Sequence, residues 1–338
     1  MVRIKDIAEY VGVSTTTVSN VINGKDQRVS ESVRKKIKMA LDEMGYVPNM
    51  SAMMLAQTNS GMIGVVIPHK TGTKITLDDP YYSSLLGNLE FEIRKHNYYM
   101  YLIAQQTEEE IIKQAIAWNL EGLIVCNMAQ AELLSLCKRY RKNIVSIDTY
   151  LNRKANFINV MTDDLGGGYQ MGNYLISQGH NKIAMVADND VSVDHYRWMG
   201  LQRAMAEHSL EITEEDHMIL SSIESVRALQ LEELLDKFKM YTALFVASDF
   251  YALELSSFLQ SKMVKIPDDI SIAGFDDLIY AKLARPKLTT MSQNIGRKAG
   301  MAVEALLSMK ENPDITRKWV LDVKLTERES VKRIRHND

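Results

Sequence analysis

Cysteine is scarce in this chain of 338 residues, and its scarcity excludes two kinds of protein. Only Cys126 and Cys137 are present. A disulfide-stabilised scaffold needs several regularly spaced cysteines, and a zinc site needs cysteine or histidine at ligand spacing. The chain has neither, so we expect no structural disulfide and no metal. Cys126 lies in the apolar run 122–126, which favours a buried free thiol.

Long hydrophobic runs and a leader peptide are also lacking. No apolar run reaches the 18 residues or so that a membrane span needs. The first ten residues carry Arg3, Lys5, Asp6 and Glu9, so they contain no apolar core of a signal peptide. We therefore expect a cytoplasmic protein with no membrane partner.

The motifs of common enzymes and cofactor sites are missing as well. There is no Gly-x-Ser-x-Gly, no His-Glu-x-x-His and no phosphate-binding glycine loop. The glycines at 166–168 open a predicted helix but lack the Lys-Ser/Thr of such a loop, which favours close helix packing. We therefore expect no catalytic residues and no cofactor.

A strong charge of one sign is absent overall, since the formal net charge is −3. Residues 1–60 hold eight Lys and Arg against six Asp and Glu, so this segment is +2 and the remainder is −5. A mildly basic head on an acidic body suits a nucleic-acid reader.

The head has the pattern of three short helices. Residues 4–11 place apolar side chains at helical spacing, and Gly12 follows. Ser14 is a suitable N-cap for a second helix over 15–21. A third helix begins after Ser30 or Ser32 and ends at Gly45. Two short helices joined by a glycine-containing turn predict a helix-turn-helix domain.

The outer face of the second helix is polar, with Thr15, Thr16, Thr17, Ser19 and Asn20. In helix-turn-helix proteins this end of the second helix contacts base edges in the major groove. Short polar side chains also cap and solvate a helix start, so composition alone leaves both roles open.

Ordered segments of the head resemble the N-terminal signature of the LacI/GalR family of bacterial repressors. They are IKDIAEYVGVS at 4–14, TVSNVIN at 17–23, VS at 29–30 and GYVPN at 45–49. The resemblance implies that Thr15, Thr16 and Asn20 read bases. It also implies capping, packing or phosphate contacts for a second set: Ser14, Thr17, Ser19, Asn23 and Ser30.

Two departures from the family pattern affect the predicted DNA contacts. Asn20 stands where the family commonly has Arg, and Asn prefers adenine where Arg prefers guanine. In the linker, Leu55 occupies the position of a leucine that the family inserts into the minor groove. Met53 stands nearby where Arg is frequent. An ordinary apolar role for Leu55 in an interdomain helix is the alternative.

The body alternates apolar runs with amphipathic stretches. Predicted strands are 62–68, 99–104, 122–127, 143–148, 182–187, 217–221, 243–247 and 270–275. Predicted helices are 82–98, 108–119, 130–140, 165–178, 198–208, 225–238 and 250–262. Such alternation predicts parallel sheets flanked by helices. We therefore expect an α/β body of two lobes, with a ligand cleft at the carboxyl ends of the strands.

The family resemblance continues through the body, at landmarks such as ASD at 247–249 and ISIAGFDD at 270–277. It implies a two-lobed body like the periplasmic sugar-binding proteins. The expected domains are a helix-turn-helix head over 1–47, a hinge linker over 48–60, and a ligand-binding and dimerisation body over 61–338. Lobe N would hold about 61–160 and 292–320, and lobe C about 161–291 and 321–330.

Candidate effector-binding residues lie at strand ends or match family positions. They are Tyr81, Tyr82, Asp148, Arg197, Asp249 and Asp276. Carboxylates and arginine can bond sugar hydroxyls while aromatic rings cover the sugar faces. Salt bridges or helix caps are the alternative role for the charged members of this set.

The combined pattern predicts a homodimeric repressor that binds a pseudo-palindromic operator in double-stranded DNA, since one head reads one half-site. The resemblance favours a sugar or sugar derivative as inducer. A purine or a protein corepressor is the alternative. A solute-binding receptor lacks such a head, and an enzyme lacks motif support.

Overall fold

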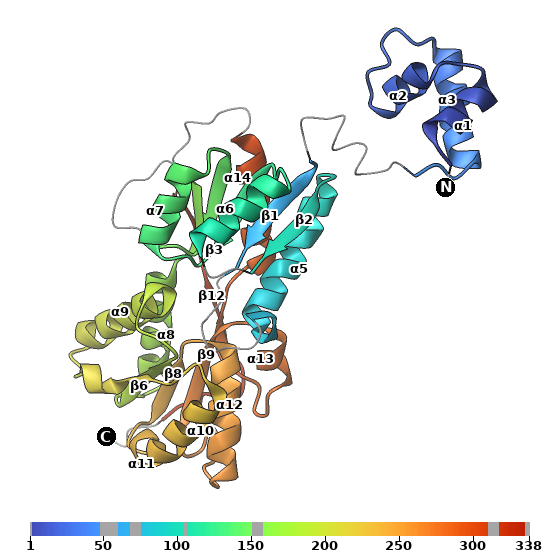
Figure 1. The fold of residues 1–338 in the computed structure, drawn as a ribbon. Helices are drawn as coiled ribbons and strands as arrows, with labels where there is room; N and C mark the ends of the chain where they lie inside the picture. The colour runs from blue at the N-terminus through green and yellow to red at the C-terminus, as the bar shows by residue number, and fades with distance from the viewer. Residues whose placement is uncertain are drawn as a thin grey trace. The chain divides into compact units, whose positions relative to one another are not determined.

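The computed structural model describes residues 2–47, 60–67, 76–104, 107–150, 158–309 and 318–334. The chain divides into two compact units, Met1–Ser60 and Gly61–Asp338 (Figure 1). Each unit is described by itself below. The linker residues 48–59, Met53 and Leu55 among them, lie outside the described residues. No described helix is long and apolar enough to cross a membrane.

The head consists of helices α1 (Ile4–Val11), α2 (Thr15–Ile22) and α3 (Glu31–Glu43). Gly12 ends α1 with a left-handed backbone (φ 76°), a conformation that glycine adopts without strain. The Ser14 hydroxyl accepts the Thr17 N–H at 3.1 Å and caps α2. The predicted helix-turn-helix layout is confirmed. A small core joins the three helices: Ile7, Ala8, Val18, Val21, Ile37 and Ala40.

Lobe N of the body is built on a parallel sheet in the order β11-β5-β4-β3-β1-β2. Its strands are β1 (Met62–Val66), β2 (Tyr99–Ile103), β3 (Gly122–Cys126), β4 (Asn143–Ile147), β5 (Ile158–Thr162) and β11 (Lys318–Leu321). One core holds α5 (Pro80–Lys95) and α14 (Ile295–Ser308) against the sheet. A second core, on the other face, holds α6 (Glu108–Ala117) and α7 (Gln130–Arg139).

Lobe C repeats the plan with the order β12-β10-β9-β8-β6-β7, in which only the β10–β12 pair is antiparallel among the described strands. Its strands are β6 (Ile183–Ala187), β7 (His217–Ile219), β8 (Ala243–Val246), β9 (Ser271–Asp276), β10 (Thr289–Ser292) and β12 (Lys324–Thr326). Its helices are α8 (Asp164–Ser177), α9 (Ser192–Glu207), α10 (Glu224–Glu233), α11 (Leu235–Phe238), α12 (Asp249–Ser261) and α13 (Ile279–Leu283). Short 3-10 turns η1 (Thr76–Asp78) and η2 (Glu214–Asp216) complete the body.

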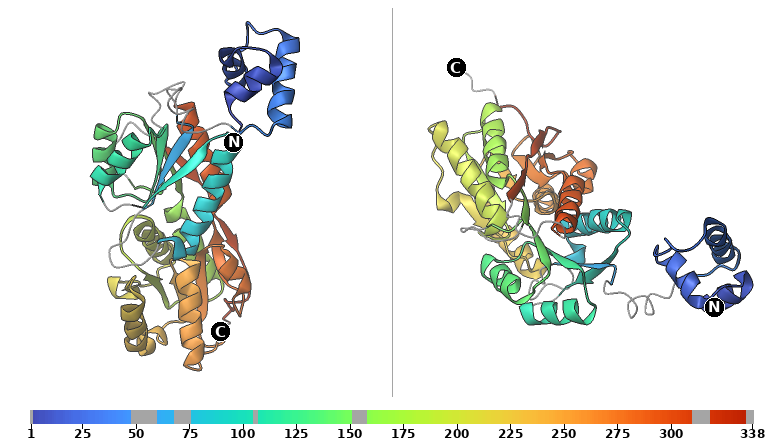
Figure 2. Two further views of the ribbon diagram at one scale, coloured as in Figure 1. Left: turned by 45° about the vertical axis from the view of Figure 1, so that its right-hand side comes forward. Right: turned by 90° about the horizontal axis from the view of Figure 1, so that it is seen from above.

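The chain passes between the lobes three times, after β5, after β10 and after β11. The two sheets stay in separate lobes in both views of Figure 2. The α/β two-lobed fold predicted from the alternation is confirmed. The largest differences from the prediction lie in two helices: α9 begins at Ser192 rather than near 198, and the helix expected over 225–238 is divided into α10 and α11. Other predicted elements differ by up to three residues at an end.

Glycine lets α8 and α9 pack backbone to backbone. A Cβ on Gly168 would meet the carbonyl of Arg197, and one on Gly200 would meet the carbonyl of Leu165. The packing role predicted for the glycines at 166–168 is therefore confirmed at Gly168, and this contact fixes the position of the Arg197 backbone.

Candidate functional site

The head presents an exposed polar face at the start of α2. Thr15 and Thr16 are exposed and Asn20 is half-buried. Among the described residues, no hydrogen bond occupies the side chains of these three residues. Free donors and acceptors at the N-terminal end of such a helix are what base recognition requires.

The remaining predicted DNA contacts of the head are engaged within it. Ser14 and Thr17 share a hydroxyl contact of 2.9 Å. The Asn23 amide donates to the Ser19 carbonyl at 2.8 Å and to its hydroxyl at 3.2 Å. Ser30 precedes α3, with its hydroxyl 3.3 Å from that of Ser32. These bonds shape the ends of α2 and α3 and leave the outer face to Thr15, Thr16 and Asn20.

Substituting Asn20 by arginine should change the base that the head prefers. Asparagine pairs with the adenine edge and arginine with the guanine edge, a difference of about 1–3 kcal/mol per good contact. Selection from randomised DNA duplexes with wild-type protein and Asn20→Arg measures this directly. We expect one position per half-site to move from A toward G. Identical selected sequences would remove Asn20 from the base-reading set.

The body contains a cavity at the carboxyl ends of the strands of both lobes. Its empty space is about 740 Å³, including space open to solvent. Five of the six predicted effector residues line it: Tyr81, Tyr82, Asp148, Arg197 and Asp276. The rest of the lining is Asp79, Asn127, Asp188, Asn189, Val193, Asp194, Ala247, Ser248, Phe250, Tyr251, Leu278 and Gln293.

Asp148 follows β4 with a left-handed backbone (φ 53°) and is held on both oxygens. Its Oδ2 accepts from the Tyr81 hydroxyl at 2.5 Å and from Lys298 Nζ at 2.7 Å, while Oδ1 accepts from the Thr162 N–H at 3.2 Å. Burial and the Asp148 carboxylate raise the pKa of Tyr81 well above its usual value. Tyr81 therefore stays a hydroxyl donor.

A polar chain continues from Lys298 to the other lobe. Lys298 Nζ donates to Gln293 Oε1 at 2.7 Å, and Gln293 Nε2 donates to Asp276 Oδ1 at 2.6 Å. Thr162 also donates to Gln293, at 3.0 Å. Gln293 follows β10 in a segment where the polypeptide crosses between the lobes. This series of hydrogen bonds therefore connects the strand ends of both lobes.

Arg197 lies inside α9, whereas the predicted strand over 182–187 and helix over 198–208 placed it in the connection between them. Its Nε and Nη2 each lie 2.8 Å from Asp164 Oδ1, and its Nη1 donates to the Ala247 carbonyl at 2.6 Å. The guanidinium also stacks 3.7 Å above the centre of the Phe275 ring. Arg197 thus borders the cavity while its charge is compensated mainly by Asp164.

Asp249 does not line the cavity, so it is removed from the candidate effector site. Its carboxylate accepts from the Thr290 hydroxyl at 2.6 Å and from the Leu278 N–H at 2.8 Å. Burial raises the pKa of Asp249 to about 7. Asp249 follows a strand, as predicted, but its side chain ties α12 to the neighbouring strand and loop.

Tyr82 is the other aromatic residue of the prediction, and it belongs largely to the core. It is 5% exposed, and its hydroxyl accepts from the Asn127 amide at 3.3 Å. Phe250 and Tyr251 are aromatic residues of the cavity that the sequence prediction missed. They lie in the first turn of α12, which follows β8 after a short connection, so the position of this helix start at the strand end could have indicated them.

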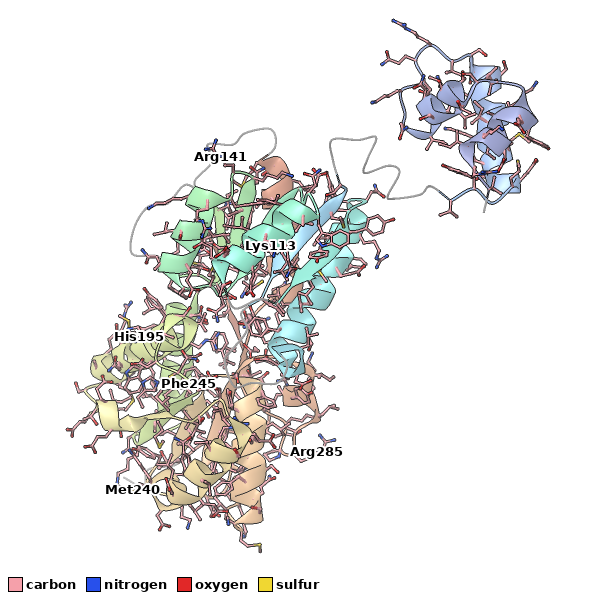
Figure 3. All side chains as sticks on the ribbon, in the orientation of Figure 1. Lys113, Arg141, His195, Met240, Phe245 and Arg285 are labelled. Carbon is pink, nitrogen blue, oxygen red and sulfur yellow. The ribbon has the colours of Figure 1, made fainter. Side chains whose placement is uncertain are left out.

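Several contacts hold the two lobes together beside the cavity. Ser192 Oγ donates to Asn127 Oδ1 at 3.1 Å, and the rings of Tyr150 and Tyr196 stack with centroids 3.8 Å apart. Figure 3 shows side chains across the body and labels His195, which neighbours Tyr196 on α9. Movement of one lobe against the other would have to break these contacts, so they favour the arrangement of the lobes in this structure.

A helix-turn-helix head joined to a two-lobed α/β body with a polar cleft defines a DNA-binding transcription regulator. Two family models match the chain: bacterial regulatory proteins of the lacI family over residues 3–49, and a periplasmic binding protein-like domain over residues 173–331. The chain belongs to the LacI family of DNA-binding transcriptional repressors.

Relatives match over nearly the whole length. The HTH-type transcriptional regulator GalR of Escherichia coli (strain K12) is 30% identical, with 94% of this chain and 92% of the relative covered. The HTH-type transcriptional repressor PurR of Vibrio atlanticus (strain LGP32) is 29% identical over 98% of this chain and 99% of its own. A Lac repressor dimer bound to operator and the anti-inducer ONPF shares the fold, with a TM-score of 0.83 at 23% identity and coverage of 98% and 99%.

Proposed function

We propose that the protein is a homodimeric operator-binding repressor whose DNA affinity is set by a small polyhydroxylated effector, a sugar or sugar derivative, bound between the lobes. The cavity at the strand ends carries this proposal. It combines carboxylates and amides, which accept and donate hydrogen bonds to hydroxyls, with the rings of Phe250 and Tyr251. A ligand that contacts both lobes at once stabilises one arrangement of the lobes over the other.

Structural neighbours of similar fold bind sugars, which supports a sugar as the effector. One structural neighbour is a CelR–cellobiose complex, with a TM-score of 0.71, and another LacI-family regulator from Enterococcus faecium has bound ribose, with a TM-score of 0.70. The Lac repressor neighbour is a dimer on its operator. A dimer places two heads on two half-sites, which is how helix-turn-helix proteins read palindromic DNA.

A purine corepressor is the second candidate. Several relatives with 28–29% identity carry the name HTH-type transcriptional repressor PurR, and a planar base could stack on the rings of Phe250 or Tyr251. The two candidates predict opposite effects on DNA binding, since an inducer releases the operator and a corepressor tightens it.

A thermal-shift screen distinguishes these candidates, because a ligand of the folded state raises its melting temperature. The panel should contain neutral sugars, amino sugars, sugar phosphates, nucleosides and purines. Each hit is then added to a complex with a duplex selected from random DNA. A sugar that lowers DNA affinity supports the proposal. A purine that raises DNA affinity supports the purine corepressor instead of the sugar.

Phe250→Ala should weaken effector binding by about tenfold, since a buried aromatic contact contributes on the order of 1–2 kcal/mol. Phe250 is 37% exposed on the first turn of α12, so its removal should leave the fold intact. Phe91→Ala is the matched control, because Phe91 is 55% exposed on α5 and does not line the cavity. Equal ligand affinity in both variants would place the effector elsewhere.

A further inference from the structure

The cavity between the lobes carries an excess of negative charge. Five aspartates line it against one arginine, a formal excess of four negative charges. Asp164 and Lys298 do not line the cavity but pair with the lining residues Arg197 and Asp148, respectively, and their opposite charges leave the excess unchanged. Carboxylates gathered in a poorly solvated space repel one another and any anion that enters.

Arg197 has little capacity left to compensate a ligand of negative charge. Its guanidinium makes four contacts with protein acceptors: two with Asp164, one with the Ala247 carbonyl, and one of 3.5 Å with Asp194. An arginine has five N–H groups. Most of them are therefore used inside the protein.

Asp276 has an acceptor that is still available. It is 4% exposed and lines the cavity, and its Oδ1 accepts from Gln293 at 2.6 Å. Within the described ranges no donor reaches its Oδ2, and no cation forms an ion pair with it. A carboxylate oxygen can accept more than one hydrogen bond, so Asp276 Oδ2 is available to a donor group of a ligand.

Asp194 is a second carboxylate of the cavity that has no cation of its own among the described residues. Its Oδ2 accepts from the Asn189 amide at 2.7 Å, and its nearest cation is the shared Arg197. Burial raises the pKa of both Asp194 and Asp276 well above the usual value, with nearby carboxylates acting in the same direction. A cation between them would offset this repulsion. The rings of Phe250 and Tyr251, which also line the cavity, favour a cation as well.

We propose that the effector carries a protonated amino group that binds Asp276 and Asp194, so that the cavity takes a polyhydroxylated amine such as an amino sugar and rejects phosphorylated sugars. This inference rests on the proposed sugar-type effector and names its charge. The hydroxyl groups of such a ligand would be left to the amides of Asn127 and Asn189 and to Ser248, which line the same space.

Matched sugars that differ in one group test the charge. The probes are D-glucosamine, D-glucose, N-acetyl-D-glucosamine and D-glucose 6-phosphate, with the corresponding galactose and mannose series, titrated into the full-length protein. We expect an amino sugar to bind about tenfold or more tightly than its neutral parent, since hydrogen bonds to charged groups are the stronger ones. The acetylated and phosphorylated forms should bind more weakly than the amine.

Variants then locate the amine. Asp276→Asn should reduce the preference for the amine to near parity with the parent sugar, and Asp194→Asn provides a second site if the first variant misfolds. Asp236→Asn, whose side chain is 96% exposed on α11, is the control and should keep the full preference.

Each result has a definite meaning. Binding of a neutral or phosphorylated sugar as tight as that of its amine overturns the charge inference and keeps the sugar effector. An amine preference that survives both Asp276→Asn and Asp194→Asn overturns the assigned position. Absence of binding by every sugar, amines included, overturns both this inference and the proposed effector class.

Discussion

Replacing Lys298 by methionine is expected to destabilise the body by about 3–5 kcal/mol, the usual cost of removing one partner from a buried ion pair. Lys298 is 1% exposed and bonds Asp148, Gln293 and the Tyr81 hydroxyl, at 2.7, 2.7 and 3.2 Å. Methionine fills similar space but leaves the Asp148 carboxylate without its cation. All three tryptophans lie in the body, so urea unfolding followed by tryptophan fluorescence reports on this unit.

The control for Lys298→Met is Lys95→Met on α5. The Lys95 side chain is 61% exposed, and its pair with Glu92 lies at the surface. Such pairs contribute less than about 1 kcal/mol. The double variant Lys298→Met with Asp148→Asn should recover much of the loss, because no buried charge is then left alone. Equal losses for Lys298→Met and Lys95→Met would show that the buried pair contributes nothing to stability.

The same residue shows where prediction from sequence stopped. Lys298 and Asp148 are 150 positions apart, and α14 reaches Asp148 only because β10 leads the chain back to lobe N. A lysine in an otherwise amphipathic helix has the pattern of a solvated residue. Nothing in its neighbourhood along the chain indicates burial. No helix or strand is predicted from the sequence after residue 275, where the strands β10, β11 and β12 are short and complete sheets begun much earlier in the chain.

Patterns of neighbouring residues predicted the head correctly, because its contacts join residues close together in the sequence. Helical spacing, Gly12 and the Ser14 cap defined the head because each contact spans only a few residues. The strand-end rule located Asp148 and Asp276 at the cavity, because buried parallel strands are recognisable as continuous apolar runs and their ends are therefore clear in the sequence. The same rule failed at Asp249, because position after a strand does not determine the direction of a side chain.

Arg197 was misplaced for a different reason. The helix that contains it begins at Ser192 after Val191, and the N-cap residue makes no side-chain cap bond. Without a Ser, Thr, Asp or Asn cap, the start of α9 has no clear signal in the sequence. Its position is instead determined by packing on α8, where Gly168 and Gly200 allow close approach.

Ile37→Ala in the head is expected to abolish sequence-specific DNA binding while leaving the body unchanged. Ile37 is fully buried at the centre of the three-helix core, and such a truncation costs about 2–5 kcal/mol. A domain of this size has little stability to spare, so the head should be largely unfolded. Only the folded head binds a duplex selected from random DNA. The apparent affinity should therefore fall about tenfold for each 1.4 kcal/mol by which the unfolded head is more stable than the folded head.

Met39→Ala supplies the matched control, because Met39 lies on the same helix and is 52% exposed. It should bind the selected duplex like the wild type. The tryptophan unfolding transition should be the same in all three proteins, since it reports on the body alone. Retained DNA binding in Ile37→Ala would show that the head is much more stable than its small core implies, or that DNA restores its fold. A loss in Ile37→Ala alone establishes that α2 recognises DNA only when the core beneath it is intact.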